Sequence, residues 1–281
     1  MKSKIDLHIH STYSDGEYDI DELLKFLKKK KIKYFSICDH DNIKSYYDIK
    51  KRKLKRIKYI SGVEISTYLE YTCFHILGYN YHGDISALED LLSKISKKRR
   101  IRAKEMIDKI EDNHDLKFGE SEVEKVLEHP SVGKKHVAKM MMKKNLGTTY
   151  LEILKKFMTG LHLPTSYRVS VDEACNAIIS SNGIPVLAHP KEYELRYNIK
   201  IEDYIERLIE AGIKGIEVYN SIHTVEDTKR YRKLAKKYKL ITTGGSDYHG
   251  PAKHKVEIGT LVKDVEKLRR IGKISLIDNI K

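Results

Sequence analysis

The chain has 281 residues, 40% hydrophobic and 33% charged, a composition that favours one large globular α/β domain and argues against disorder. No apolar run approaches the roughly 20 residues that span a bilayer, and the polar N-terminus does not resemble a signal peptide, so we expect a cytoplasmic protein. The net charge of +14 suits anionic partners such as nucleic acid, nucleotides or phosphorylated metabolites, although a lysine-rich composition can also simply maintain solubility. The three cysteines have no paired spacing, which argues against a disulfide framework.

Strands and helices alternate over the first 80 residues. The predicted strands are 4–9, 33–38, 57–64 and 73–79, and the predicted helices are 19–30 and 43–55. Asp19 and Glu22 have the spacing of a capping box, and Leu23, Leu24 and Leu27 follow as an apolar stripe. This alternation is typical of a parallel sheet with crossover helices.

The alternation stops in residues 84–158, where the sequence predicts several helices and no strand. A long helix is expected from about 85 to 111. Alternation resumes near Ser170, which forms a second capping-box pattern with Glu173. The remaining predicted elements are strands 184–188, 214–218 and 240–244, helices 201–211 and 224–238, and a late strand–helix pair. We therefore expect an α/β barrel interrupted by a helical insertion.

Histidines and carboxylates recur near the C-terminal ends of almost all the predicted strands. Asp6, His8 and His10 lie at strand spacing, so they project from one face of the first strand. The active site of a parallel barrel forms at the C-terminal ends of its strands and in the loops that follow them. Histidines or carboxylates on six separate segments are hard to explain as structural residues, so the pattern favours a catalytic site.

The residue types point to metal ions. Imidazole and carboxylate together suit zinc, manganese or iron, whereas carboxylates alone would suit magnesium. A catalytic ion takes about three protein ligands, so the number of candidates predicts two or three divalent ions. Two ions about 3.5–4 Å apart could hold a hydroxide between them and clamp the oxygens of an in-line phosphoryl displacement. The candidate ligands are His8, His10, Asp15, His40, Glu64, His75, His189, Asp247 and His249.

The ordered strings DLHIHSTYSDG, CDHDN, SGVEIS, HILGY, PVLAHP, GIEVYN and GGSDYHG resemble the PHP (polymerase and histidinol phosphatase) family of metal-dependent phosphoesterases. An HxH pair is weak by itself, but the ordered set is highly specific. The resemblance implies a distorted (β/α)7 barrel with an inserted helical subdomain. The barrel would comprise residues 1–80 and 165–281, and the insertion residues 81–164.

The family implies a site for three ions. By matching motif, His8, His10, Glu64 and Asp247 would hold the first ion. Glu64 would bridge to a second ion, which His75 and His189 complete, and the third would lie between Asp15, His40 and His249. Asp39 would either orient ligand histidines or serve as a turn residue at the end of its strand. Asp247 and His249 are also expected among the catalytic residues.

The insertion resembles the branch of the family that acts on nucleoside monophosphates, 3′,5′-bisphosphonucleotides and the 5′ ends of short RNAs. The Gly-Arg-Pro-His motif of that branch, which helps to bind phosphate, is matched here by residues 133–136, GKKH. Lysine keeps the charge of arginine but loses its bidentate fork. Lys134 and His136 are therefore candidate phosphate contacts, or residues of a solvated helix start. The family's further basic position before residues 163–165 is lost.

Two weaker features follow. Asn220 and His223 come after the strand GIEVY and are candidate substrate contacts. His223, near a helix start, could also protonate the leaving group or be a plain helix residue. The basic run 97–104 could contact an RNA backbone or form a solvated helix face.

We expect a phosphoric ester hydrolase, a phosphatase or phosphodiesterase. Its substrates would be phosphate monoesters of nucleotides, of the AMP or 3′,5′-bisphosphonucleotide type, or the 5′ ends of short RNAs, with a metal-bridged hydroxide as nucleophile. Histidinol phosphatase is the alternative within the family, disfavoured by the insertion. A non-catalytic nucleic-acid-binding PHP module is the alternative of another class, disfavoured by the complete ligand set. The oligomeric state stays open.

Overall fold

The computed structural model describes residues 5–163, 168–251, 256–261 and 275–279. The chain divides into two compact units, one of residues 1–91 with 169–281 and the other of residues 92–168. The sequence-based division at residues 81 and 164 stays a proposal. No helix in the described ranges is both long and apolar enough to cross a bilayer.

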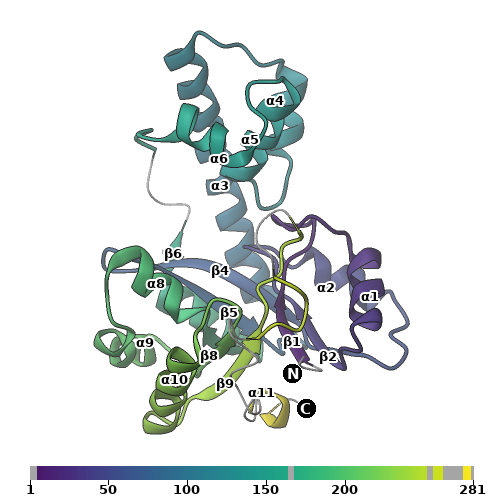
Figure 1. Cartoon of the computed structure of the whole chain (residues 1–281), viewed down its shortest axis with the longest axis vertical. Helices are drawn as coiled ribbons and strands as arrows, with labels where there is room; N and C mark the ends of the chain where they lie inside the picture. The colour runs from purple at the N-terminus through teal and green to yellow at the C-terminus, as the bar shows by residue number, and fades with distance from the viewer. Residues whose placement is uncertain (1–4, 164–167, 252–255, 262–274, 280–281) are drawn as a thin grey trace. The chain divides into compact units, whose positions relative to one another are not determined.

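The first unit contains two sheets of predominantly parallel strands (Figure 1). A three-stranded parallel sheet has the order β1 (Ile5–Ile9), β2 (Tyr34–Ile37), β3 (Lys58–Tyr59). A six-stranded sheet has the order β6 (Val169–Ser170), β4 (Gly62–Leu69), β5 (Thr72–Tyr79), β7 (Ile184–Leu187), β8 (Gly215–Asn220), β9 (Ile241–Gly245).

Backbone hydrogen bonds join the two sheets at two places. On the β1 side, the Asp247 N–H donates to the His8 carbonyl over 2.8 Å, and an isolated bridge follows between Ile9 and Tyr248. On the β2 side, the residues after that strand bridge to β4 through His40 and Glu64. The strands therefore follow one another around an interrupted ring, which is the predicted distorted barrel.

Amphipathic helices cover the strands of this unit. They are α1 (Ile20–Lys29), α2 (Lys44–Lys50), α7 (Val171–Ser180), α8 (Pro190–Tyr197), α9 (Ile205–Glu210), α10 (Val225–Lys237) and α11 (Leu276–Asn279), with a 3-10 turn at Ile201–Asp203. Both predicted capping boxes are confirmed, Asp19 with Glu22 before α1 and Ser170 with Glu173 before α7. The predicted leucine stripe of α1 is buried and packs with Phe35 and other apolar side chains of β2.

The sequence prediction was wrong on strand direction and on one strand boundary. The strand expected over 57–64 is divided, because residues 60–61 pass from the first sheet into the second. β5 pairs antiparallel with both β4 and β7. Only Glu70 and Tyr71 separate β4 from β5, and so short a connection can join only antiparallel strands. The helix expected over 201–211 is also divided, at Tyr204. Of the late strand–helix pair, only α11 lies within the described residues.

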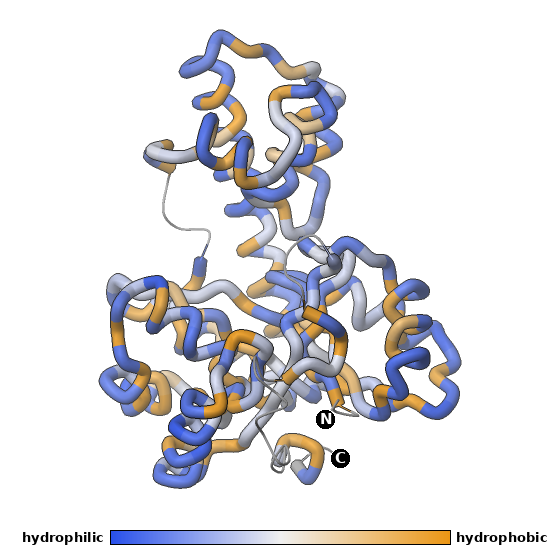
Figure 2. Tube along the Cα trace, in the orientation of Figure 1, coloured by the Kyte–Doolittle hydropathy of each residue, from blue (hydrophilic) through white to orange (hydrophobic). Residues whose placement is uncertain are grey.

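The second unit is helical, as predicted. It contains most of α3 (Ser86–His114), followed by α4 (Glu120–Leu127), α5 (Lys134–Lys143), α6 (Tyr150–Ile153) and a π-helical turn at Leu154–Met158. Apolar and polar residues alternate along these helices, as Figure 2 shows. Their apolar faces enclose a separate core that includes Met106, Ile110, Val137 and Met141, so this unit has its own packing centre.

Candidate metal centre

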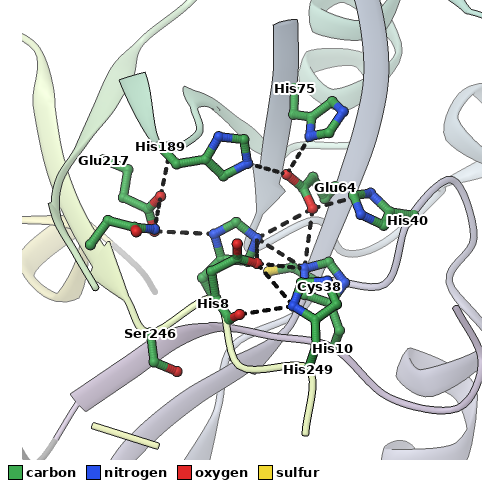
Figure 3. Close-up of polar contacts among 12 residues, drawn as sticks. His8, His10, Cys38, His40, Glu64, His75, His189, Glu217, Ser246 and His249 are labelled. Atoms are coloured by element: carbon green, nitrogen blue, oxygen red, sulfur yellow. Dashed lines mark hydrogen bonds and ion pairs between the residues drawn. The ribbon is translucent and has the colours of Figure 1, made fainter. Parts of the chain in front are cut away.

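The candidate ligands converge on the first unit's barrel from strand ends and the loops after them. His8, Glu64 and His75 lie within β1, β4 and β5. The others follow strands: His10 and Asp15 come after β1, His40 after β2, His189 after β7, and Asp247 and His249 after β9. Figure 3 shows the histidine rings gathered around one carboxylate.

That carboxylate is Glu64, which is fully buried. Its Oε1 lies 2.9 Å from His75 Nδ1 and 2.8 Å from His189 Nε2. Its Oε2 faces three more imidazole nitrogens, at 3.3 Å from His8 Nε2, 3.2 Å from His10 Nε2 and 3.1 Å from His40 Nδ1. Neither Glu64 Oε2 nor His40 Nδ1 makes a hydrogen bond within the described part of the chain. Five histidines thus direct nitrogen atoms at one carboxyl group.

Three groups of donor atoms are close enough to share an ion, with all atoms of a group within 4.8 Å of one another. The groups are His8, His10, Glu64 and Asp247; His10, Asp15, His40 and His249; and His40, Glu64 and His75. The first group matches the set implied by the resemblance. The other two differ from the implied sets in detail, because His10 joins the second group and His40 the third. His189 contacts Glu64 without being a member of the third group.

The spacing of the first group fits a divalent ion. The two Nε2 atoms of His8 and His10 are 3.2 Å apart. Each of them lies 3.1 to 3.5 Å from Glu64 Oε2 and from Asp247 Oδ1. Two ligand atoms, each about 2.1 Å from a tetrahedral ion, are separated by roughly 3.4 Å. Nitrogen and carboxylate oxygen donors are also the types that zinc, manganese and iron accept. The residues present therefore fit divalent metal ions.

Hydrogen bonds select which nitrogen of His8 and of His249 faces the centre. His8 Nδ1 donates to Glu217 Oε1 over 3.1 Å, and His249 Nδ1 donates to the Asp247 carbonyl over 2.8 Å. In both rings Nε2 is then left as the acceptor atom directed at the cluster. Such bonds hold the tautomer and the ring orientation that a metal ligand needs.

Asp39 supports the centre through two serines. It accepts hydrogen bonds from the backbone and hydroxyl of Ser11 and from Ser14 Oγ, the last at 2.6 Å. Ser14 Oγ in turn lies 3.4 Å from His10 Nδ1. Asp39 therefore acts on His10 through Ser14, and it also ties down the loop after β1.

Burial and neighbouring charges perturb the pKa values of the clustered groups. Burial would raise the pKa of Glu64, but the surrounding histidines, His40 first, lower it well below its ordinary value. For His8 burial acts to lower the pKa, yet Glu217 and the other nearby carboxylates raise it well above that of free imidazole. His8 therefore binds its proton strongly when no ion is present, and a metal ion would have to displace it.

A glycine permits the close packing beneath the cluster. A Cβ placed on Gly245, at the end of β9, would lie 2.2 Å from His8 Cβ and 2.3 Å from the His8 backbone nitrogen. No other residue type fits there without moving β1 or β9, so Gly245 keeps His8 in register with Asp247.

Glu217, in the middle of β8, is a site residue that the sequence reasoning missed. It is fully buried and, besides His8, accepts hydrogen bonds from the His189 backbone N–H over 2.8 Å and from Asn220 Nδ2 over 2.9 Å. The available signal was an acidic residue at an inner position of an otherwise apolar strand. Its partners His8 and His189 could not be identified from the sequence, because they come from β1 and from the end of β7.

Asn220 and His223 lie near this network but are directed inward. Both are fully buried. Asn220 donates to Glu217 and accepts from the Ile222 N–H. His223 Nδ1 donates to the Val218 carbonyl over 3.0 Å, and its Nε2 has no hydrogen-bond partner in the described residues. Burial lowers the pKa of His223 to about 4. At neutral pH its ring is therefore uncharged, and the unprotonated Nε2 can accept a hydrogen bond.

The remaining predicted residues belong to the second unit. Lys134 and His136 occupy the first turn of α5, and the His136 ring lies against the His129 ring with centroids 3.8 Å apart and the planes tilted by 33°. The basic run 97–104 lies on α3, as predicted, but several of its charges have protein partners. Arg99 is buried and donates to the Val132 carbonyl, and Arg100 forms an ion pair with Glu124.

An interrupted barrel with histidines and carboxylates gathered at its strand ends is a framework suited to divalent metal ions. A model of the PHP domain matches residues 6–151, more than half of the chain, and the protein belongs to this family. The predicted family is thereby confirmed.

Curated bacterial relatives align over most of the chain. This protein is 26% identical to the phosphoribosyl 1,2-cyclic phosphate 1,2-diphosphodiesterase of Eggerthella lenta, over 87% of this chain and 94% of the relative. It is 25% identical to the 3′,5′-nucleoside bisphosphate phosphatase of Chromobacterium violaceum, over 92% and 91%. It is 28% identical to a 5′-3′ exoribonuclease of Haemophilus influenzae, over 89% and 92%. All three names describe hydrolysis of phosphoric esters.

Solved structures share the fold. An amidohydrolase from Chromobacterium violaceum, with sulfate bound and no metal, superposes with a TM-score of 0.77 at 24% identity, over 92% of this chain and 90% of the other. A protein from Bifidobacterium adolescentis, assigned only by prediction as a metal-dependent phosphoesterase, superposes with a TM-score of 0.78 at 21% identity, over 92% of each chain.

Proposed function

We propose that the protein is a metal-dependent phosphoesterase that hydrolyses phosphate monoesters of nucleotides or the 5′ ends of short RNAs. The observation that carries the proposal is the buried Glu64 carboxylate with five imidazole nitrogens directed at its two oxygens. Such an arrangement is costly to bury unless ions occupy it, because buried charge must be compensated. The named activities of the bisphosphatase and exoribonuclease relatives support nucleotides as the substrate class.

Two or three divalent ions, of manganese, zinc or iron, would be held by the nine clustered side chains. When bound, they would supply positive charge to the phosphoryl oxygens and lower the pKa of a water molecule. The chain's own residues prepare this chemistry. Glu217 holds His8 in its ligand tautomer, the Asp247 carbonyl does the same for His249, and Asp39 positions His10 through Ser14.

The finer assignments are also proposals. Lys134 and His136 would contact phosphate, and the basic run on α3 would contact RNA through its exposed cations, Lys97 and Lys98 among them. His223, whose Nε2 is unprotonated at neutral pH, would bind substrate by accepting a hydrogen bond rather than protonate the leaving group. We also propose a cytoplasmic location.

A cyclic phosphodiester is a second candidate substrate. The Eggerthella lenta relative, named as a cyclic phosphate diphosphodiesterase, aligns over 94% of its own length. The same metal centre could serve either ester, because both reactions displace an oxygen at phosphorus.

The test is phosphate release with added manganese from AMP, 3′,5′-bisphosphoadenosine, a short 5′-phosphorylated RNA, histidinol phosphate and phosphoribosyl 1,2-cyclic phosphate, with nucleotide and ring-opened products also followed. We expect turnover of a nucleotide or RNA substrate that is lost in His10→Ala and Asp247→Ala. His82→Ala is the matched control, because His82 is exposed and outside the cluster. Full activity in either cluster variant, or turnover of histidinol phosphate alone, would contradict the proposal.

A further inference from the structure

The β4–β5 hairpin carries one row of side chains from the metal centre towards the turn. Its register is continuous, with Glu64 opposite Leu77, Ser66 opposite His75 and Tyr68 opposite Cys73. Alternate residues of a strand share a face, and residues opposite each other in a pair project to the same side. Glu64, Ser66 and Tyr68 therefore form a row on the face that carries His75.

Exposure increases along this row. Glu64 is 0% exposed, Ser66 2% and Tyr68 43%. On β5 the same face is partly open, because Cys73 and His75 are half-buried whereas their neighbours Thr72, Phe74 and Ile76 are buried. The hairpin face that begins at the metal cluster thus emerges into solvent at Tyr68.

Tyr68 is within reach of the chemistry. It is the diagonal neighbour of His75, and such neighbours are separated by roughly 7–8 Å, a distance that aromatic side chains can span. A nucleotide with its phosphate at the metal centre carries its base about that far from the phosphorus, on the other side of the ribose. An aromatic ring at this place has a flat apolar face to offer the base.

We propose that Tyr68 is a specificity residue that stacks on the nucleobase of the substrate. The inference rests on the proposed nucleotide phosphoesterase function and deepens it. It explains how a site of metal ligands, which recognises only the phosphate, would distinguish nucleotides from other phosphate esters. Stacking is tolerant of base identity, because each base has a π-face. The site would therefore accept all four bases.

Tyr71 provides a matched control on the same hairpin. It is 100% exposed and lies in the turn, beyond the end of β4, outside the row that leads from Glu64. Removal of its ring takes away more exposed aromatic surface from the hairpin than removal of the Tyr68 ring, which is 43% exposed. A general effect of hairpin hydrophobicity would therefore appear in both variants.

The experiment compares substrates that differ only by a base. One pair is AMP and ribose 5-phosphate; the other is a short 5′-phosphorylated RNA and the same RNA with an abasic 5′ residue. The measured quantity is the ratio of kcat/KM for the base-containing member to that for the base-free member. Base–aromatic stacking is worth about 1–3 kcal/mol by alanine substitution, so the ratio should fall roughly 5- to 150-fold in Tyr68→Ala. Tyr68→Phe and Tyr71→Ala should keep the wild-type ratio within about threefold.

Each outcome decides a separate question. If Tyr68→Ala leaves the ratio unchanged, the stacking role is overturned and the phosphoesterase proposal stays intact. The same holds if Tyr68→Ala lowers kcat/KM equally for both members of a pair. An equal fall in Tyr71→Ala would overturn it as well. A wild-type protein that turns over neither base-containing substrate would overturn the proposed function, and the inference with it.

Discussion

Replacing Glu217 by glutamine should weaken metal binding without unfolding the protein. The wild-type carboxylate accepts hydrogen bonds at both oxygens, from His8 Nδ1 at Oε1 and from the His189 N–H and Asn220 Nδ2 at Oε2. Glutamine has nearly the same shape but offers one NH₂ donor in place of an acceptor. With the wild-type tautomer of His8, two donors therefore face each other whichever way the amide is placed.

The less costly orientation places the NH₂ against His8, because the Oε2 position faces two donors that cannot change. His8 can relieve the conflict by moving its proton from Nδ1 to Nε2. That tautomer points an N–H at the cluster, 3.3 Å from Glu64 Oε2, where a lone pair is needed for an ion. Loss of such a supporting bond typically lowers metal affinity about 10- to 100-fold, or about 1.4–2.7 kcal/mol.

The assay is a calorimetric titration of the metal-free protein with manganese in the presence of a competing chelator. It measures the affinity of the protein for manganese. Glu210→Gln is the control, because Glu210 is an exposed residue of α9 and its substitution makes the same change in net charge. Retained circular dichroism and cooperative thermal melting would show that Glu217→Gln is folded. An affinity equal to that of the control variant would refute the tautomer argument.

Two further predictions concern packing and pH. Gly245→Ala should abolish high-affinity metal binding and lower the melting temperature, because its Cβ would lie 2.2 Å from His8 Cβ; an alanine variant that melts and binds manganese like the wild type would contradict this packing argument. Folding lowers the pKa of His223 from 6.5 to about 4. As the pH falls, the unfolded chain therefore binds a proton at this residue before the folded protein does. The free energy of unfolding should therefore fall by up to about 3 kcal/mol as pH drops through this window. Urea titrations of the metal-free wild type and His223→Asn between pH 7 and 4.5 should show a shallower dependence in the variant, and parallel curves would disprove the assignment.

Local features of the fold were predictable because they depend on residues close together in the chain. A capping box needs two residues three apart, so Asp19 with Glu22 and Ser170 with Glu173 could be recognised from their spacing. Strand direction depends on connection length, and it was mispredicted where a two-residue turn replaced a crossover helix. The basic run on α3 was predicted as a helix, but the pairing of Arg100 with Glu124 was not foreseen.

The sequence by itself determined the donor types, their order and the family, because histidine and carboxylate residues at successive strand ends carry their chemistry wherever the chain places them. Their convergence on Glu64, and the role of Glu217 beside His8, were decided only by the tertiary structure. His8 and Glu217 are 209 positions apart, and their hydrogen bond exists because β1, β8 and β9 are neighbours around the barrel. Local sequence patterns do not specify that register, which arises from the packing of the whole sheet.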